Sequence, residues 1–189
     1  GSAGSPGDAG IPDVSFPYDP PDAAEDDACA AVTASATSTP VDIIWIIDQS
    51  CSMATEIAQV KANVNGNFAN IIQASKLDYR VIMFANSAYS TAARQVCVLP
   101  PLGAATCGQN KPPTFFQVNR SIESWDSLSL FMNTTYYNQI KANLRPGAFK
   151  AFIEVTDDQS NPTTAAQFDA FLLSGAGAGY FGTAAKRGY

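Results

Sequence analysis

Two short polar segments carry the oxygen ligands that hard cations prefer. Asp48, Ser50 and Ser52 alternate along the first segment, and Asp157 lies in the second. Alternate residues of a tight turn can point the same way, so one carboxylate and two hydroxyls can face a single ion. Mg²⁺ binds six oxygens at roughly 2.1 Å and retains several waters. The pattern therefore predicts a Mg²⁺ site, with Ca²⁺ or Mn²⁺ as alternatives, in which an open position accepts a carboxylate from a partner.

The same residue types have a simpler interpretation as turn and capping residues. Asp and Ser commonly cap helices, and Ser52 stands where the N-cap of the next helix is expected. The metal hypothesis is preferred because two separate segments agree with it. Asp158, next to Asp157, is expected to face solvent or to support a ligand rather than to bind the ion directly.

The chain contains no histidine, which excludes Ser-His-Asp and Cys-His catalysis and zinc sites built on imidazole. Asp48 resembles the phosphoryl acceptor of dehalogenase-like phosphatases, but those use Asp-x-Asp, and here the partner position is Ser50. No Gly-rich phosphate loop follows the first apolar run. These absences predict that the protein is not an enzyme.

The hydrophobic pattern alternates between strands and helices, and the two polar segments follow predicted strands. The strand–helix–strand order favours a right-handed parallel crossover and an α/β fold. Sites in such sheets form at the carboxyl ends of strands. We expect strands at 41–48, 78–86, 114–118 and 148–155, with shorter ones at 29–40 and 94–99, and helices at 54–74, 128–144 and 163–173.

Both polar segments, with their flanking strands, resemble the von Willebrand factor A (vWA) family. The run Val-Asp-Ile-Ile-Trp-Ile-Ile-Asp-Gln-Ser-Cys-Ser-Met at 41–53 is similar to that family's first strand and Asp-x-Ser-x-Ser motif. Glu-Val-Thr-Asp-Asp at 154–158 is similar to its Thr-Asp-Gly segment. The resemblance spans roughly residues 41–175. It implies a Rossmann-like, mostly parallel sheet flanked by helices and a metal-ion-dependent adhesion site.

By this resemblance, Asp48, Ser50 and Ser52 are ligands from the first loop and Asp157 is the acid of the third loop. The family's second-loop Thr has no clear counterpart. Ser124 is the preferred candidate for this ligand, and Ser121 and Ser127 compete with it. Cys51 and Asp158 replace glycines of the family motifs. A full domain of the family has about two more strands and a helix after the third loop. The sheet therefore either continues beyond Tyr189 or has an open edge on its C-terminal side.

Charge divides the chain into two predicted regions. Residues 1–28 carry seven of the seventeen acids and none of the eleven bases, together with many Gly and Pro. This composition predicts a flexible acidic linker ahead of a vWA-like domain at 29–189. The bases of the domain are scattered, so nucleic-acid binding is not expected. No apolar run reaches the 18 or so residues of a membrane span.

The four cysteines lack CxxC spacing, which argues against a zinc ribbon or a thioredoxin-like motif. Their even number in a charge-poor domain favours two disulfides and an oxidising compartment, with four buried thiols as the alternative. Cys97 and Cys107 flank a Pro- and Gly-rich segment, so we expect a local bridge there. Cys29 would then pair with Cys51 by elimination.

These observations predict an extracellular binding module. The resemblance implies that it is of the adhesion type and similar to bacterial secreted or lipid-anchored members of the family. Its divalent ion would complete its coordination with an Asp or Glu carboxylate of a protein partner. The alternative is a structural protein that assembles with other copies of itself, through strand donation at an open sheet edge or by its N-terminal arm.

Overall fold

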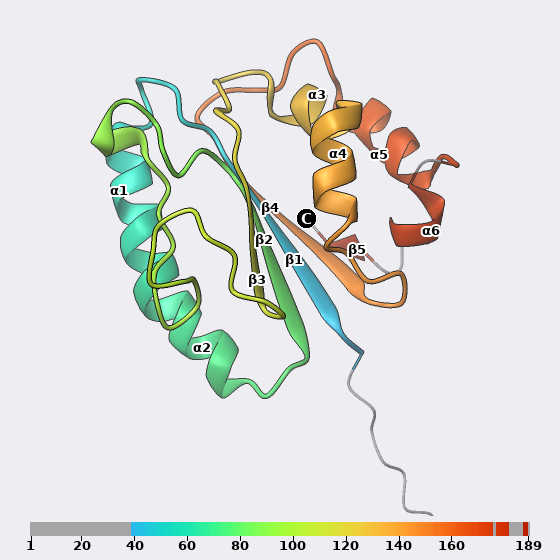
Figure 1. Cartoon of the computed structure of the whole chain (residues 1–189). Coiled ribbons are helices and arrows are strands. Elements are labelled where there is room, and N and C mark those ends of the chain that lie inside the picture. The colour runs from blue at the N-terminus through green and yellow to red at the C-terminus, as the bar shows by residue number, and fades with distance from the viewer. Residues whose placement is uncertain (1–38, 176, 182–186, 189) are drawn as a thin grey trace, which may run out of the picture. The chain divides into compact units, whose positions relative to one another are not determined.

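Among the described residues, five parallel strands form one sheet in the order β3-β2-β1-β4-β5. The computed structural model describes residues 39–175, 177–181 and 187–188. Helices flank the sheet (Figure 1), and the predicted α/β, Rossmann-like architecture is confirmed. The strands are β1 (Val41–Ile47), β2 (Tyr79–Phe84), β3 (Phe115–Val118), β4 (Phe149–Val155) and β5 (Arg187–Gly188).

β1 occupies the middle of the sheet because both of its faces are apolar. Ile43 and Ile47 pack on one side, and Ile44 and Ile46 pack on the other. β2 and β4 are its hydrogen-bonded neighbours. A strand covered on both faces by helices is expected to be a nearly continuous apolar run, which is what the sequence contains.

One face of the sheet is covered by a long helical segment, as expected for residues 54–74. It consists of α1 (Ala54–Asn63), a π-helical turn η1 (Val64–Phe68) and α2 (Ala69–Ala74). The π-helical turn includes Gly66, and irregular hydrogen bonding is common where a helix contains weak helix formers. Trp45 of β1 packs edge-on against Phe68 of this turn, with ring centroids 5.4 Å apart.

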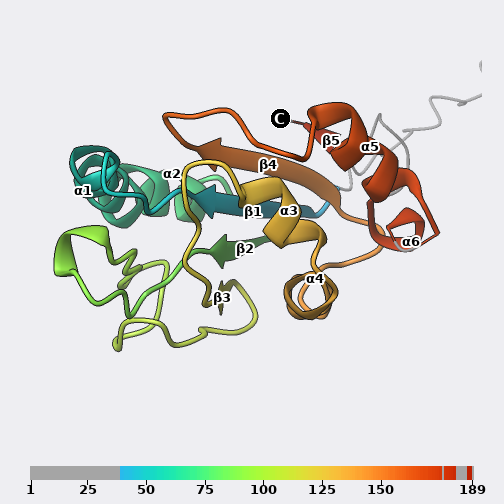
Figure 2. The same cartoon turned by 90° about the horizontal axis from the view of Figure 1, so that it is seen from above.

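The opposite face carries α3 (Ser127–Met132), α4 (Thr134–Lys141), α5 (Ala165–Leu173) and α6 (Ala178–Phe181), as Figure 2 shows from above. The prediction of a single helix across 128–144 is wrong, because the helix is interrupted at Asn133. Its ψ of 128° is extended, and its side chain accepts a hydrogen bond from the Thr135 N–H. Asn133 therefore ends one helix and caps the next.

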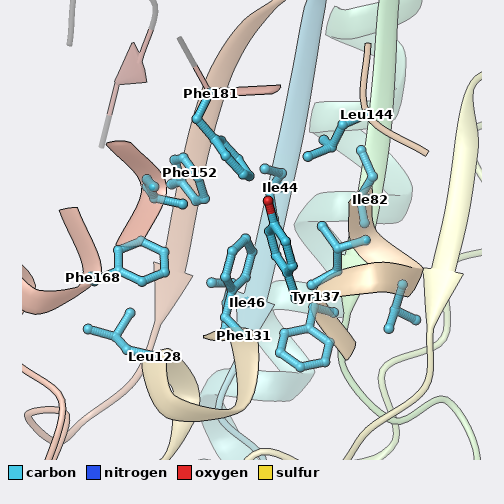
Figure 3. Packing of buried hydrophobic residues seen from close by; sticks show 14 of the residues in the cluster. Ile44, Ile46, Ile82, Leu128, Phe131, Tyr137, Leu144, Phe152, Phe168 and Phe181 are labelled. Carbon is cyan, nitrogen blue, oxygen red and sulfur yellow. The ribbon is translucent and has the colours of Figure 1, made fainter. Parts of the chain in front are cut away.

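An aromatic core fills the space between the sheet and α3–α6 (Figure 3). Phe131 lies at its centre, within ring-centroid distances of 5.2 Å from Phe168 and 5.8 Å from Phe152. Because aromatic side chains bury large areas, this cluster is a main source of the domain's stability. Its remaining aromatic members are Phe84, Tyr137 and Phe181.

The strand predicted at 94–99 is also wrong. A 3₁₀ turn, Ala92–Arg94, is followed by irregular chain. The amide side chain of Asn65 on η1 donates to the Cys97 carbonyl and accepts from the Leu99 N–H, at 3.0 and 2.7 Å. Since side-chain groups satisfy this backbone, it does not need a neighbouring strand.

The disulfide between Cys97 and Cys107 is confirmed. Cys51 is exposed and has no disulfide partner among the described cysteines. Its predicted partner Cys29, the predicted linker at 1–28 and most of the expected strand at 29–40 lie outside the described residues. Within the part of the chain that the structure describes, no helix is long and apolar enough to cross a membrane.

Breaking the Cys97–Cys107 bridge is expected to lower the free energy of unfolding by about 3 kcal/mol, because the unfolded chain regains the entropy of a roughly ten-residue loop. The measurement is urea unfolding of the Cys97→Ser/Cys107→Ser double variant. Cys51→Ser is the matched control, since it removes a thiol without opening a described bridge. Equal unfolding midpoints for the double variant and the control would contradict the prediction.

Candidate functional site

Three loops meet at the carboxyl end of the sheet: residues 48–53 after β1, 119–126 after β3, and 156–164 after β4 (Figure 1). Backbone hydrogen bonds fix the first loop in place. The Asp48 N–H donates to the Val155 carbonyl at the end of β4 at 3.0 Å, and the Gln49 N–H donates to the Ile122 carbonyl of the second loop at 2.7 Å. The first loop is thereby fixed to the end of β4 and to the second loop, as the parallel topology predicts.

Asp48 is the central side chain of this site. It is 1% exposed, and each carboxylate oxygen accepts one hydrogen bond. Oδ1 accepts from the Ser50 N–H at 2.7 Å, and Oδ2 accepts from the Thr156 hydroxyl at 3.0 Å. A carboxylate oxygen has about two acceptor positions, so each oxygen of Asp48 keeps capacity for a further ligand.

Ser50 and Ser52 face each other, with their hydroxyl oxygens 3.1 Å apart. Ser52 does not cap the following helix as the simpler interpretation required. The residue at the N-cap of α1 is Met53, and no side chain makes a capping hydrogen bond there. The two hydroxyls therefore lie together on the loop that begins at Asp48, without the capping role that would explain them.

The third loop contributes Thr156, which the sequence analysis did not identify as a site residue. Besides its bond to Asp48, its hydroxyl contacts the carbonyl oxygens of Asp158, at 3.1 Å, and Ser124, at 3.5 Å. Asp157, the predicted third-loop ligand, directly follows Thr156 and is exposed. Its carboxylate makes no hydrogen bond or ion pair with another described residue, so it is available to a ligand.

The second loop distinguishes the three serines considered for the missing ligand. Ser121 accepts a hydrogen bond from the Asn86 amide at 2.9 Å, and Ser127 is 4% exposed at the start of α3. Ser124 is only partly buried, and its backbone is the part of this loop that approaches Thr156. Of the three, Ser124 is the one whose backbone contacts the third loop.

Negative charge is concentrated at the site. Burial raises the pKa of Asp126, and the neighbouring Glu123 and Asp48 carboxylates raise it further, against the lowering effects of the Glu123 backbone N–H and Arg120. Asp126 accepts a hydrogen bond from that N–H at 2.8 Å. Neighbouring carboxylates disfavour one another's ionisation, and a bound cation would offset this repulsion.

A polar cluster that the sequence analysis missed supports the first loop from the side. The buried Gln49 amide bonds the backbone of Asn86 through both its oxygen and its nitrogen. Arg94 donates to the Gln49 carbonyl, pairs with Glu123 at 3.0 Å and lies 4.2 Å from the Tyr89 ring centroid. Nothing in the spacing of these residues identifies the cluster, because it joins three separate segments.

The donor set fits a hard cation that is bound partly by hydroxyls and water. Within the described residues, no group of three or more His, Cys, Asp and Glu side chains can hold a metal ion. Asp48, Ser50 and Ser52 instead offer one carboxylate and two hydroxyls, and Asp157 provides a further carboxylate on the adjoining loop. Mg²⁺ typically uses one or two protein carboxylates and keeps several waters.

Comparisons with known proteins gave no family assignment: no protein-family model, curated protein or solved structure matched the chain.

Proposed function

We propose that this protein is an adhesion-type binding module of the vWA kind, with Mg²⁺ or a similar divalent ion held by Asp48, Ser50 and Ser52. Asp157 and the second-loop Ser124 complete the protein's ligands. One observation carries the proposal: the buried Asp48 carboxylate accepts from the Ser50 N–H, the Ser50 and Ser52 hydroxyl oxygens lie 3.1 Å apart, and neither hydroxyl caps the helix that follows.

The bound ion would supply a positive centre with an open position at the surface of the sheet's carboxyl end. An Asp or Glu side chain of a partner protein is the complementary ligand, because hard cations prefer carboxylate oxygens. Thr156 keeps Asp48 in place through its hydroxyl. Support of this kind for a ligating carboxylate tunes metal affinity.

An extracellular location agrees with this role. The Cys97–Cys107 bridge is typical of proteins from oxidising compartments. We propose that the domain acts at a cell surface or after secretion, with the acidic segment at 1–28 as the spacer from its anchor.

Replacing Asp48 by alanine is expected to weaken divalent-ion binding by more than roughly 100-fold, since loss of a supporting residue alone costs about 10–100-fold. Isothermal titration calorimetry with Mg²⁺ and with Mn²⁺ measures this directly. Asp78→Asn is the matched control, because it also removes a carboxylate charge but lies beside the start of β2, at the amino ends of the strands.

Equal ion binding by the wild type and Asp48→Ala would refute the metal site. Circular dichroism of both variants is required first, because Asp48 also joins two loops. An adhesive site should retain a protein partner that bears an exposed carboxylate in the presence of Mg²⁺ and release it when EDTA is added. If the ion binds normally but no such partner is found, the site binds metal without being adhesive.

A second function, self-assembly, is favoured by the outer edge of β4. β5 pairs only with Lys150 and Ala151, so the outer edge at 152–155 has no partner strand among the described residues. Such an edge can accept a strand from another copy. Light scattering across a range of protein concentrations tests this: a mass that stays monomeric at every concentration would exclude it.

A further inference from the structure

Two adjoining open cavities, the first mainly polar and the second mainly apolar, are lined chiefly by the third loop. The first has a volume of about 330 Å³ and is lined by Trp125, Asp158, Gln159, Ser160 and Asn161. The second, of about 410 Å³, shares Asp158, Gln159 and Ser160 and extends past Glu154, Thr163 and Thr164 towards α5. Volumes of about 300–1,000 Å³ are typical of sites for small ligands. The cavities form a trough that is open to an extended ligand.

Trp125 gives this trough one flat apolar wall. The residue is 56% exposed, although tryptophan is usually well buried because of its large apolar surface. Its backbone carbonyl accepts hydrogen bonds from the Asn161 N–H at 2.8 Å and from the Ser160 hydroxyl at 3.4 Å. The second loop, which carries the indole, is therefore fixed to the third loop at Ser160 and Asn161.

The remaining walls carry hydrogen-bonding groups with no internal partner. The Asp158 carboxylate and the Gln159 and Asn161 amides make no side-chain hydrogen bond to another described residue. Together they offer acceptors and donors. The loop that bears them is anchored at its start, since the Thr156 hydroxyl donates to Asp48 and accepts from the Asp158 N–H, at 3.0 and 3.1 Å.

We propose that this trough binds a neutral oligosaccharide. One face of a sugar ring presents C–H groups that pack on an indole, and its hydroxyls both donate and accept hydrogen bonds, matching the amides and the carboxylate opposite Trp125. No Lys or Arg lines either cavity, and Glu154 and Asp158 add negative charge, so phosphorylated and other anionic ligands are disfavoured. The shared residues of the two cavities fit a chain of sugar rings better than a single ring.

The test uses tryptophan fluorescence with cellotetraose, maltotetraose, laminaritetraose and chitotetraose as probes. The chain has two tryptophans, so a Trp45→Phe variant leaves Trp125 as the only reporter. At least one probe, at up to about 10 mM as suits a weak ligand, is expected to protect Trp125 from quenching by acrylamide. If none of the four protects it, the proposal is wrong.

Variants then locate the site by calorimetry or NMR titration. Trp125→Ala is expected to weaken binding by about tenfold, the scale of a lost aromatic contact, and Trp125→Phe by less. Gln159→Ala is expected to weaken it several-fold. Leu173→Ala, which removes another exposed apolar side chain, is the control and should bind normally. Wild-type affinity in Trp125→Ala would overturn the proposal.

The saccharide site uses other side chains than the proposed metal site, because Asp48, Ser50, Ser52, Ser124 and Asp157 line neither cavity. Removal of the ion with EDTA is therefore expected to leave saccharide binding intact. The two proposals can fail separately: loss of ion binding alone leaves the saccharide site standing, and absence of saccharide binding says nothing against the ion. A saccharide affinity that disappears in EDTA would contradict the separate site.

Discussion

Replacing Asp42 by alanine is expected to lower the free energy of unfolding by about 3–5 kcal/mol, the cost of removing one partner from a buried ion pair. Asp42 is fully buried near the start of β1. It accepts hydrogen bonds from the Arg145 Nε, at 2.8 Å, and from the Arg145 backbone N–H, at 2.7 Å. The ammonium of Lys150, also fully buried, lies 3.4 Å away.

The loss is large because the two cations stay behind. Lys150 also donates to the carbonyl oxygens of Arg145 and Ala148, but these carry no full negative charge. Without Asp42, the buried Lys150 ammonium loses the carboxylate that lies 3.4 Å from it. Burying a charge with less compensation is costly. Chemical denaturation at neutral pH measures the effect.

Asp78 offers a matched control, because it binds the same guanidinium from the surface. Its carboxylate is 64% exposed and 2.6 Å from Arg145. Asp78→Ala is expected to cost less than about 1 kcal/mol, as exposed ion pairs do. If Asp42→Ala is no more destabilising than Asp78→Ala, the buried network is not a determinant of stability.

The sequence predicted those features whose signal is local and repeated along a segment. β1 was recognisable because apolar residues occupy both of its faces, which only a central strand requires. Asp48 could then be placed at the sheet's carboxyl end, since it directly follows that strand. The same reasoning located Asp157 after β4. Because parallel strands end at the same edge of the sheet, the meeting of the loops after β1 and β4 could be predicted without knowledge of any contact.

Features that depend on pairing between distant residues could not be predicted. Lys150 in a strand would ordinarily be assigned to a solvent-exposed position, and only the β1–β4 register places it opposite Asp42. Thr156 lies in a segment that resembles a family motif, but its contact with Asp48 spans 108 residues. The interruption of the helix at Asn133 could not be predicted either. Asn can stay helical or adopt an extended conformation and cap the next helix, and propensity alone does not decide between the two.

Replacing Phe131 by alanine is expected to lower the free energy of unfolding by about 3–5 kcal/mol. The side chain is fully buried on α3, at the junction of β2, β4 and the helices on that face (Figure 3). Its ring makes edge or tilted contacts with several aromatic rings at centroid distances of 5.2–6.4 Å: Phe84, Tyr137, Phe152, Phe168 and Phe181. Truncation leaves a cavity, because rings on several separate elements cannot all move into it.

Two comparisons separate cavity formation from the loss of an aromatic group. Phe131→Leu keeps most of the volume, so it is expected to cost less than half as much as Phe131→Ala. Trp125→Ala removes a larger aromatic side chain from the surface, and it is expected to change stability by less than about 0.5 kcal/mol. Guanidinium unfolding of the three variants gives the ranking. A loss for Phe131→Ala as small as that for Trp125→Ala would mean that the core tolerates the cavity, and that the helices over this face of the sheet are held by other contacts.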